Sequence, residues 1–270
     1  MNLSVLRKVL EQDMNALSQD GGFSAILESN LLYWLSRFNP ERVLTLGTMF
    51  GGKKGIELGG PSRIFTSHGP VPVYPRTKSI TFVDFRKDNL WSQKKDSLLE
   101  EMSGKSSWEF TYSDGVLLDE FSSNSADFVI SSHVLEHIAN PIKALKRWYD
   151  ILKPGGVMLI VAPDKRFTFD HRRPLTSIQH MLSDFEHETD ESDNTHFREI
   201  IELHDRSLDD KNETLEELSC RILNNYNLRS AHHHTYTKES VSTLVTIIGM
   251  AVSYSYLIQP NNIVVAATKP

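Results

Sequence analysis

Residues 127–137 read DFVISSHVLEH, and they are followed by an apolar pattern at helical spacing over residues 142–152, the sequence LKPGG at 152–156 and the run VMLIVA at 157–162. The two apolar runs are short and rich in Val and Ile, which is typical of buried strands. A strand, a helix and a second strand in this order predict two parallel strands covered by a helix.

Three further strand-like runs precede this unit and two follow it. The earlier runs are residues 55–58, 79–83 and 108–112. The later runs, 251–258 and 263–269, flank the sequence QPNN and predict an antiparallel hairpin. The chain is therefore expected to be an α/β protein. Its sheet should have seven mostly parallel strands, closed by an antiparallel C-terminal hairpin.

The remaining segments predict additions to this core. Residues 1–50 read as helical, with Ser24 as a possible N-cap and a second helix from Pro40 that ends at Gly51-Gly52. We expect this region to pack beside the core. Residues 165–235 are polar, acidic and rich in His, and they interrupt the α/β pattern, with helices expected around 174–186 and 212–226. We expect them to form an inserted substrate cap or a flexible loop, which leaves residues 51–164 and 236–270 as the core.

Composition limits the class of protein. The 270 residues are 39% hydrophobic and 24% charged, which suits one globular domain with a cap. Residues 181–220 hold 14 Asp and Glu against 3 Lys and Arg, a net charge of −11, so binding of nucleic acid is disfavoured. Cys220 is the single cysteine, and the sequence shows neither a signal-peptide pattern nor an apolar run of membrane-spanning length. These features predict a cytoplasmic protein without a membrane span.

Small and acidic residues follow the predicted parallel strands, where an open α/β sheet binds its ligands. The first strand runs through Glu57 into Gly59-Gly60-Pro61, and the second ends at Asp84. The third leads to Asp114-Gly115. The fourth leads to Ser132-His133, and residues 131–137 are expected to open a helix. A carboxylate at such a strand end can accept hydrogen bonds from ribose hydroxyls or an exocyclic amine. Each position also fits a tight turn or a helix N-cap, so the group is more informative than any one member.

The order of these elements resembles the class I S-adenosylmethionine-dependent methyltransferases, in particular those with HVLEH and LKPGG sequences. The resemblance covers about residues 54–164 and the closing hairpin, and it implies a Rossmann-like sheet that binds S-adenosylmethionine. By position, Glu57, Gly59 and Gly60 would hold the methionine end, Asp84 the ribose, Asp114 and Gly115 the adenine, and Ser132 and His133 the methionine side.

Two departures from the family pattern stand out. The glycine loop is reduced to Gly59-Gly60-Pro61, and the interval between Glu57 and Asp84 contains the additional sequence GPVPVYP at 69–75. The loop, this insertion and residues 164–174 also resemble methyltransferases found with bacterial surface-polysaccharide biosynthesis.

The segment His133–His137 also fits the zinc-protease pattern HxxEH. Two His four residues apart on a helix share one face and can bind zinc. The same residues are accounted for by the methyltransferase resemblance after a buried strand, so zinc hydrolysis is disfavoured and no metal is assigned to the site.

Candidate residues for the acceptor side come from the segment after the fifth strand. His171 and His233 are candidate bases for a hydroxyl or amine acceptor. Arg166, with Arg172 and Arg173, can bind an anionic group, and the rings of Tyr74 and Phe169 can face a sugar. Surface or hydrogen-bonding His, solvated Arg and core aromatic residues are the competing interpretations, and the His could instead hold a metal.

We therefore expect transfer of a methyl group to a small-molecule or saccharide-type acceptor, at oxygen. The alternatives are an N-methyltransferase of another metabolite and a non-catalytic cofactor-binding partner subunit.

Overall fold

The computed structural model describes residues 49–91, 95, 98–99, 107–209, 211–258 and 260–270. The helices expected within residues 1–48 lie outside the described residues. Met49 and Phe50 are helical, and the turn at Gly51 and Gly52 ends this helix as the sequence predicts. Gly52 has a φ of 68°, the left-handed conformation that Gly adopts without a steric penalty.

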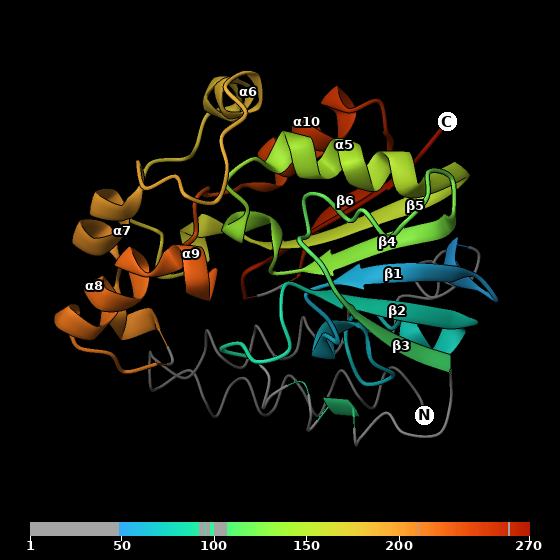
Figure 1. Cartoon of the computed structure of the whole chain (residues 1–270), viewed down its shortest axis with the longest axis horizontal. Coiled ribbons are helices and arrows are strands. Elements are labelled where there is room, and N and C mark those ends of the chain that lie inside the picture. Colours follow the sequence, from blue (N-terminus) through green and yellow to red (C-terminus); the bar gives the residue numbers. More distant parts are fainter. Residues whose placement is uncertain (1–48, 92–94, 96–97, 100–106, 210, 259) are drawn as a thin grey trace, which may run out of the picture.

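Seven strands form one sheet in the order β3-β2-β1-β4-β5-β7-β6 (Figure 1). The first five are parallel, and β7 pairs antiparallel with both β5 and β6. The expected fold class is thereby confirmed. The strand bounds are β1 Lys54–Leu58, β2 Ser79–Asp84, β3 Ser107–Tyr112, β4 Ala126–Ser132, β5 Leu152–Pro163, β6 Ala251–Ile258 and β7 Asn262–Thr268.

Helix α5 (Pro141–Ile151) connects β4 to β5 and covers one face of the sheet together with α10 (Lys238–Ile247). Asn140 caps α5 by accepting a hydrogen bond from the Lys143 backbone N–H, and Pro141 occupies the first turn, where it costs no hydrogen bond. Trp148 of α5 has a fully buried side chain, and its Nε1 donates to the carbonyl of Gly115. The helix therefore anchors the loop that follows β3.

The other face carries a second apolar cluster. It includes Phe50, Phe65, Tyr74 and Phe82, all nearly or fully buried. Two short 3-10 helices supply residues to this cluster, η1 (Arg63–Phe65) and η2 (Tyr74–Arg76), and they lie between β1 and β2 in the sequence. The Pro-rich insertion therefore packs as part of the core.

Residues 165–235 are folded, and their described part carries four helices. These are α6 (Ile178–Glu186), α7 (Phe197–Leu203), α8 (Leu215–Leu223) and α9 (Asn225–Leu228). The 3-10 helix η4 (Lys165–Phe167) precedes α6, and η5 (Arg206–Leu208) lies between α7 and α8. Helices α7 and α8 enclose a small core of Phe197, Ile200, Leu218, Ile222 and Ala231. Figure 1 shows α7, α8 and α9 beyond the arrowheads of β1 and β4. Asp164 and Tyr236 form a bridge, so the two ends of the segment lie side by side.

Three local predictions differ from the structure. Residues 133–137 do not begin an α-helix: His133 has a φ of 54° and is followed by the 3-10 helix η3 (Leu135–His137). This geometry removes the shared helix face that the HxxEH pattern needs. Strand β5 begins at Leu152, so the LKPGG sequence is part of the strand. The helix expected over residues 212–226 is divided into α8 and α9. Within the described part of the chain, every helix is too short or too polar to span a bilayer.

Candidate active site

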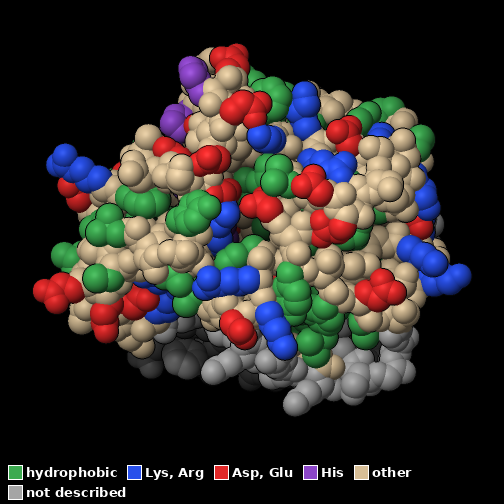
Figure 2. Space-filling view, viewed as in Figure 1, with side chains coloured by type: hydrophobic (Ala, Val, Ile, Leu, Met, Phe, Trp, Pro, Cys, Tyr) green, Lys and Arg blue, Asp and Glu red, His purple; other side chains and the backbone are tan. Residues whose placement is uncertain are grey.

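A cavity of about 440 Å³ lies at the carboxyl ends of β1, β2, β3 and β4. Its lining combines apolar side chains such as Leu58 and Val83 with charged ones such as Asp84, and two residues of the inserted segment, Glu191 and Arg229, belong to it. Figure 2 shows the molecule hollowed between the inserted helices at the left and the sheet at the right. The predicted site residues that line the cavity are Gly59, Asp84, Asp114, Gly115, Ser132 and His133.

Asp84 ends β2 and is held by three donors. Its Oδ1 accepts from the Phe85 backbone N–H at 2.9 Å, and its Oδ2 accepts from Asn89 Nδ2 at 2.8 Å and from Lys95 Nζ. An ionised carboxylate offers about four acceptor positions, so these contacts leave about one free. A ligand that makes two hydrogen bonds to Asp84 must therefore displace Lys95 or share its position.

Asp114 lies in the loop after β3, and fewer of its hydrogen-bond acceptor positions are occupied than those of Asp84. Its Oδ1 accepts from the Val116 backbone N–H at 2.8 Å, and its Oδ2 lies 3.5 Å from Nη2 of Arg229. Arg229 also pairs with Glu191 at 2.8 Å, so the inserted segment is linked to the sheet through this guanidinium. The carboxylate of Asp114 thus retains acceptor capacity toward the cavity.

Glu57 lies behind the glycine loop and not in the cavity wall. It is fully buried and accepts a hydrogen bond from the Tyr74 hydroxyl at 2.6 Å, and that hydroxyl accepts from the Ser62 backbone N–H at 2.6 Å. A Cβ on Gly60 would lie 2.4 Å from the Glu57 carboxyl carbon, so Gly60 allows the loop to pack over Glu57. Among the described residues, neither Glu57 nor Gly60 is part of the cavity lining.

The prediction that the Tyr74 ring faces a sugar is wrong, because Tyr74 is buried beside Glu57. Its ring is 3% exposed and lies 5.6–6.0 Å, between centroids, from the rings of Phe65, Phe82 and Trp108. Because the side chain is enclosed in the core, Tyr74 positions the glycine loop through its hydroxyl and cannot face an acceptor.

Burial of Glu57 makes the free energy of unfolding depend on pH. Loss of hydration raises the pKa of Glu57 from 4.5 to about 8, so the folded state keeps a proton that the unfolded state releases near pH 4.5. Between these values the free energy of unfolding falls as pH rises, by at most about 1.4 kcal/mol per pH unit for one group.

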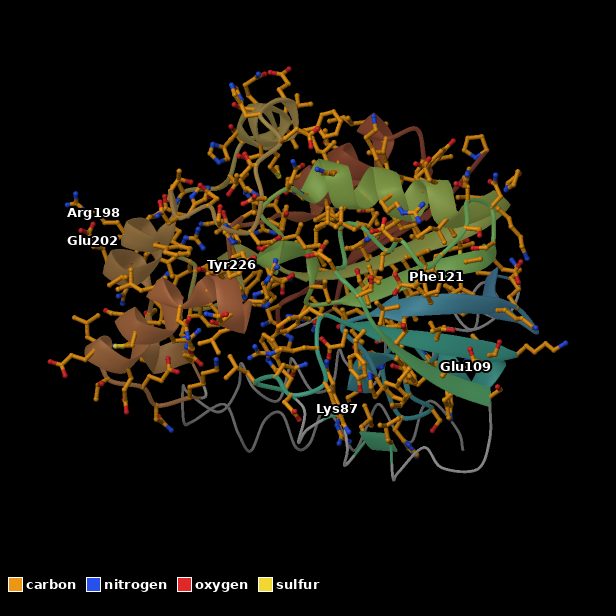
Figure 3. The ribbon with its side chains drawn as sticks, viewed as in Figure 1. Lys87, Glu109, Phe121, Arg198, Glu202 and Tyr226 are labelled. Atoms are coloured by element: carbon orange, nitrogen blue, oxygen red, sulfur yellow. The ribbon has the colours of Figure 1, made fainter. Side chains whose placement is uncertain are left out.

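We expect Glu57→Gln to remove this decrease, so that the variant gains stability relative to the wild type from pH 5 to pH 8. Urea unfolding at several pH values measures the effect. Glu109→Gln, on the exposed side of β3 (Figure 3), should retain the wild-type slope. Parallel pH profiles for Glu57→Gln and the wild type would contradict this account.

His137, at the end of η3, lines the cavity beside Ser132 and His133. Its Nδ1 lies 3.1 Å from the carbonyl oxygen of Ala231, which can only accept, so Nδ1 carries the proton and Nε2 keeps its lone pair. Burial, followed by the charge of His232, holds the pKa of His137 well below 6.5. The imidazole is therefore neutral at pH 7, as a general base must be.

The two predicted bases lie elsewhere. His171 is partly exposed, and its Nε2 lies 2.9 Å from Asp205. His233 is fully buried, with Nε2 3.0 Å from Asn225 Nδ2 and Nδ1 3.7 Å from Asp193. Neither is part of the cavity lining among the described residues. The buried position of His233 prevents direct contact with an acceptor, because its ring is enclosed by the inserted segment.

The other candidates on the inserted segment make contacts within the protein. Arg166 pairs with Asp164, and Arg172 pairs with Asp205. Arg173 is fully buried and contacts Asp170, Glu199 and the carbonyls of His232 and His233. Phe169 stacks on His204 with ring centroids 4.4 Å apart and is tilted against His232 at 4.9 Å. Arg166 and Phe169 are outside the described cavity lining.

Several cavity residues were not singled out from the sequence as contacts. Trp91 and Lys95 follow β2, and Trp91 places its ring centroid 5.5 Å from that of His137. Glu191 and Arg229 belong to the inserted segment, and no local sequence pattern predicts that this segment packs over the sheet. The HVLEH sequence includes His137 and could have indicated it. The helix expected there did not predict that its side chain lines the cavity. Figure 3 shows Arg198 and Glu202 of α7, which pair at 2.7 Å, at the outside of the molecule.

Comparison with known proteins finds one matching family and several similar structures. The model of a protein family described as "Methyltransferase domain" matches residues 31–249. The trans-methyltransferase CalH in complex with SAH has a TM-score of 0.50 and 14% identity, covering 90% of this chain and 59% of that chain. A SAM-dependent methyltransferase from Aquifex aeolicus has a TM-score of 0.47 and 14% identity, covering 87% and 92%. A search of curated proteins found no match.

The donor set of the cavity suits an adenosyl sulfonium. Two carboxylates, Asp84 and Asp114, stand at neighbouring strand ends, and apolar side chains such as Leu58 and Val116 form surfaces for a flat ring. Gly59 has a φ of 73°, and a Cβ at this position would lie 2.5 Å from Cγ2 of Val134, so glycine allows the loop to follow this path along the cavity. With its family match and sheet order, the chain belongs to the methyltransferase-domain family and is an S-adenosylmethionine-dependent methyltransferase.

Proposed function

We propose that this methyltransferase transfers a methyl group to a hydroxyl oxygen of a small-molecule or saccharide-type acceptor, with His137 as the general base. One observation carries the proposal: the neutral imidazole of His137, with a free Nε2, lines the same cavity as Asp84 and Asp114. His137 takes the place of His171 and His233 in this proposal, because those two lie outside the described lining.

The proposed cofactor contacts follow from the cavity wall. Asp84 binds the ribose hydroxyls, and Asp114 with Gly115 binds the adenine. Gly59, Ser132 and His133 line the methionine side. Glu57 and Gly60 do not contact the cofactor in this proposal. They set the position of the glycine loop through packing and the Tyr74 hydroxyl.

Bound S-adenosylmethionine supplies an electrophilic methyl group on a cationic sulfur. Displacement at this carbon requires an oxygen nucleophile in line with the breaking bond, so the protein mainly aligns the partners and excludes water. His137 Nε2 accepts the hydroxyl proton as the new bond forms, and the imidazole becomes a cation. The carboxyl of Glu136, fully buried, belongs to the same cluster of ligand atoms within 4.8 Å and can stabilise that charge.

The charged residues of the cavity lining favour a polar acceptor. Arg63, Lys95, Glu191 and Arg229 all border the cavity and carry charges of both signs. Such a lining suits a polyhydroxylated molecule, which agrees with the resemblance to methyltransferases of surface-polysaccharide biosynthesis. We propose that residues 165–235 act as the substrate cap, because Glu191 and Arg229 belong to them. The single, exposed and unpaired thiol of Cys220 supports a cytoplasmic location.

The proposal is tested by incubating the protein with S-adenosylmethionine carrying a deuterated methyl group and with sugar nucleotides and oligosaccharides. We expect S-adenosylhomocysteine to bind by calorimetry and one labelled methyl to appear on a hydroxyl, located by mass spectrometry and NMR. A label on nitrogen would contradict the assigned atom, and absence of calorimetric binding at millimolar ligand would contradict the cofactor site.

A further inference from the structure

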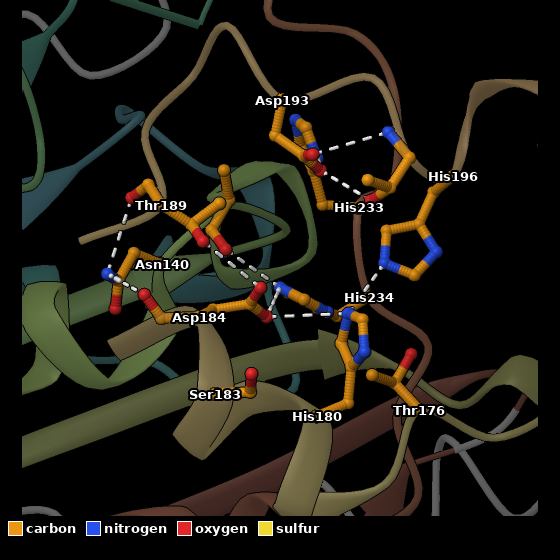
Figure 4. Close-up of polar contacts among 12 residues, drawn as sticks. Asn140, Thr176, His180, Ser183, Asp184, Thr189, Asp193, His196, His233 and His234 are labelled. Carbon is orange, nitrogen blue, oxygen red and sulfur yellow. Dashed lines mark hydrogen bonds and ion pairs between the residues drawn. The ribbon is translucent and has the colours of Figure 1, made fainter. Parts of the chain in front are cut away.

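We infer that the inserted segment contains a binding site for a divalent transition metal of the zinc class, formed by His180, His196, His234 and Asp184. These side chains converge from separate parts of residues 165–235 (Figure 4). The site does not depend on the identity of the acceptor or on the role of His137.

The distances among His180, His196 and Asp184 are close to those of a tetrahedral site. His180 Nε2 lies 3.0 Å from His196 Nε2 and 3.5 Å from Asp184 Oδ2. One ligand atom from each of the three His lies within 4.8 Å of the others. Ligands at about 2.0–2.1 Å from a tetrahedral zinc are separated by about 3.3–3.4 Å, so small side-chain shifts produce the geometry.

Two buried atoms at this cluster lack the partner that a metal would provide. Asp184 Oδ2 and His234 Nδ1 have no hydrogen-bond partner among the described residues. His234 is 1% exposed, and its Nε2 lies 3.0 Å from the carbonyl oxygen of Ala139, so Nε2 carries the proton and Nδ1 has the free lone pair. A His that donates its other N–H to a backbone carbonyl has the usual outer-shell arrangement of a metal ligand.

The chemistry of the four groups selects the metal class. Imidazole nitrogens suit zinc and neighbouring transition metals, whereas calcium and magnesium prefer oxygen ligands. Three imidazoles and one carboxylate fill a four-coordinate site, which is the closed form of a structural zinc centre. Hydrogen bonds alone leave the cluster incomplete, because a single proton between His180 and His196 satisfies neither Asp184 Oδ2 nor His234 Nδ1.

The positions of the ligands show what the metal would connect. His180 and Asp184 are four residues apart on α6 and share a face, His196 is the N-cap residue of α7, and His234 precedes α10. The loop between α6 and α7 also carries Glu191, whose Oε1 accepts from the Ala139 backbone N–H at 3.1 Å and which lines the cavity. A metal at this cluster would therefore fix the part of the cap that closes over the cofactor cavity.

The experiment uses the full chain without a histidine tag, stripped with EDTA and dialysed against zinc, with metal content measured by mass spectrometry. We expect about one zinc per chain and a rise in Tm on zinc addition. His180→Gln, His196→Gln and Asp184→Asn should each weaken zinc binding by about 100-fold or more, exceeding the usual effect of an outer-shell partner. His187→Gln, exposed at the end of the same helix, is the matched control and should bind zinc as the wild type does.

Cobalt substitution provides a readout that is independent of folding defects. The wild type should show the intense visible bands of tetrahedral cobalt, and Asp184→Asn, which preserves shape, should lose them while keeping its circular dichroism spectrum. A wild type without bound zinc would overturn the inference. Retention of zinc by His180→Gln together with loss in His137→Gln would also overturn it, by assigning the metal to the cluster of Glu136, His137 and His232 beside the cavity.

Discussion

Replacing His137 by Gln is expected to lower the rate of methyl transfer by about 10²- to 10⁴-fold, the usual contribution of a positioned general base. Gln keeps a side chain that can donate to the Ala231 carbonyl, but it has no lone pair of comparable basicity. Affinity for S-adenosylhomocysteine should change little, because the proposed contacts to ribose and adenine come from Asp84 and Asp114. Single-turnover rates and calorimetry on the same preparation separate these two effects.

The pH profile distinguishes a base from a residue that only fills space. Burial holds the pKa of His137 well below 6.5, so the wild type should keep its base deprotonated through the neutral range. Activity is lost when pH falls below the pKa of the folded protein, because the protonated ring cannot accept the hydroxyl proton. We expect the acid limb of kcat/KM to lie below pH 6.5 in the wild type and to be absent in His137→Gln.

Two comparisons make this result specific. His187→Gln changes an exposed His outside the described cavity lining and should have the wild-type rate. His171→Gln changes a residue that the sequence favoured as a base but that the structure places beside Asp205. A full rate in His137→Gln, with a large loss in His171→Gln, would show that the cap rearranges and delivers its own base.

The sheet could be predicted from the sequence because its signals are local. The first four strands contain short runs of apolar or aromatic residues, and Gly59, Asp84, Asp114 and Ser132 stand at or within two residues of their ends, so the position of each carboxyl end can be read from the sequence. Asp84 and Asp114 were found for this reason, and both line the cavity. The start of β5 was harder to predict. Gly and Pro normally end an element, but β5 includes the LKPGG sequence.

The acceptor side could not be predicted because its contacts join residues far apart in the sequence. Arg229 reaches Asp114 across 115 positions, and His137 bonds the Ala231 carbonyl across 94. No periodic pattern encodes such pairs. The choice of His233 failed for a related reason: a run of three His shows that imidazoles are present, but not that the middle one is fully buried. Tyr74 likewise gave no sign that its hydroxyl supports Glu57.

Changing Asp84 to Asn should weaken S-adenosylhomocysteine binding by about 10- to 150-fold, which corresponds to roughly 1.5–3 kcal/mol for hydrogen bonds to a charged group. The amide keeps the size of the carboxylate but provides one acceptor oxygen in place of two. Calorimetry measures the change, and Asp119→Asn, an exposed acid outside the described lining, should bind as the wild type does.

Lys95 provides a sharper test of the same contact. Its ammonium occupies an acceptor position on Asp84 Oδ2, and Asn89 and the Phe85 backbone N–H occupy two more. If ribose hydroxyls bind this carboxylate, they compete with Lys95, so Lys95→Met should strengthen cofactor binding in the wild type and have no effect in Asp84→Asn. An equal effect of Lys95→Met in both backgrounds would mean that Lys95 contacts the cofactor directly. Unchanged affinity in a folded Asp84→Asn variant would place the ribose away from Asp84, and the orientation proposed for the cofactor would then be wrong.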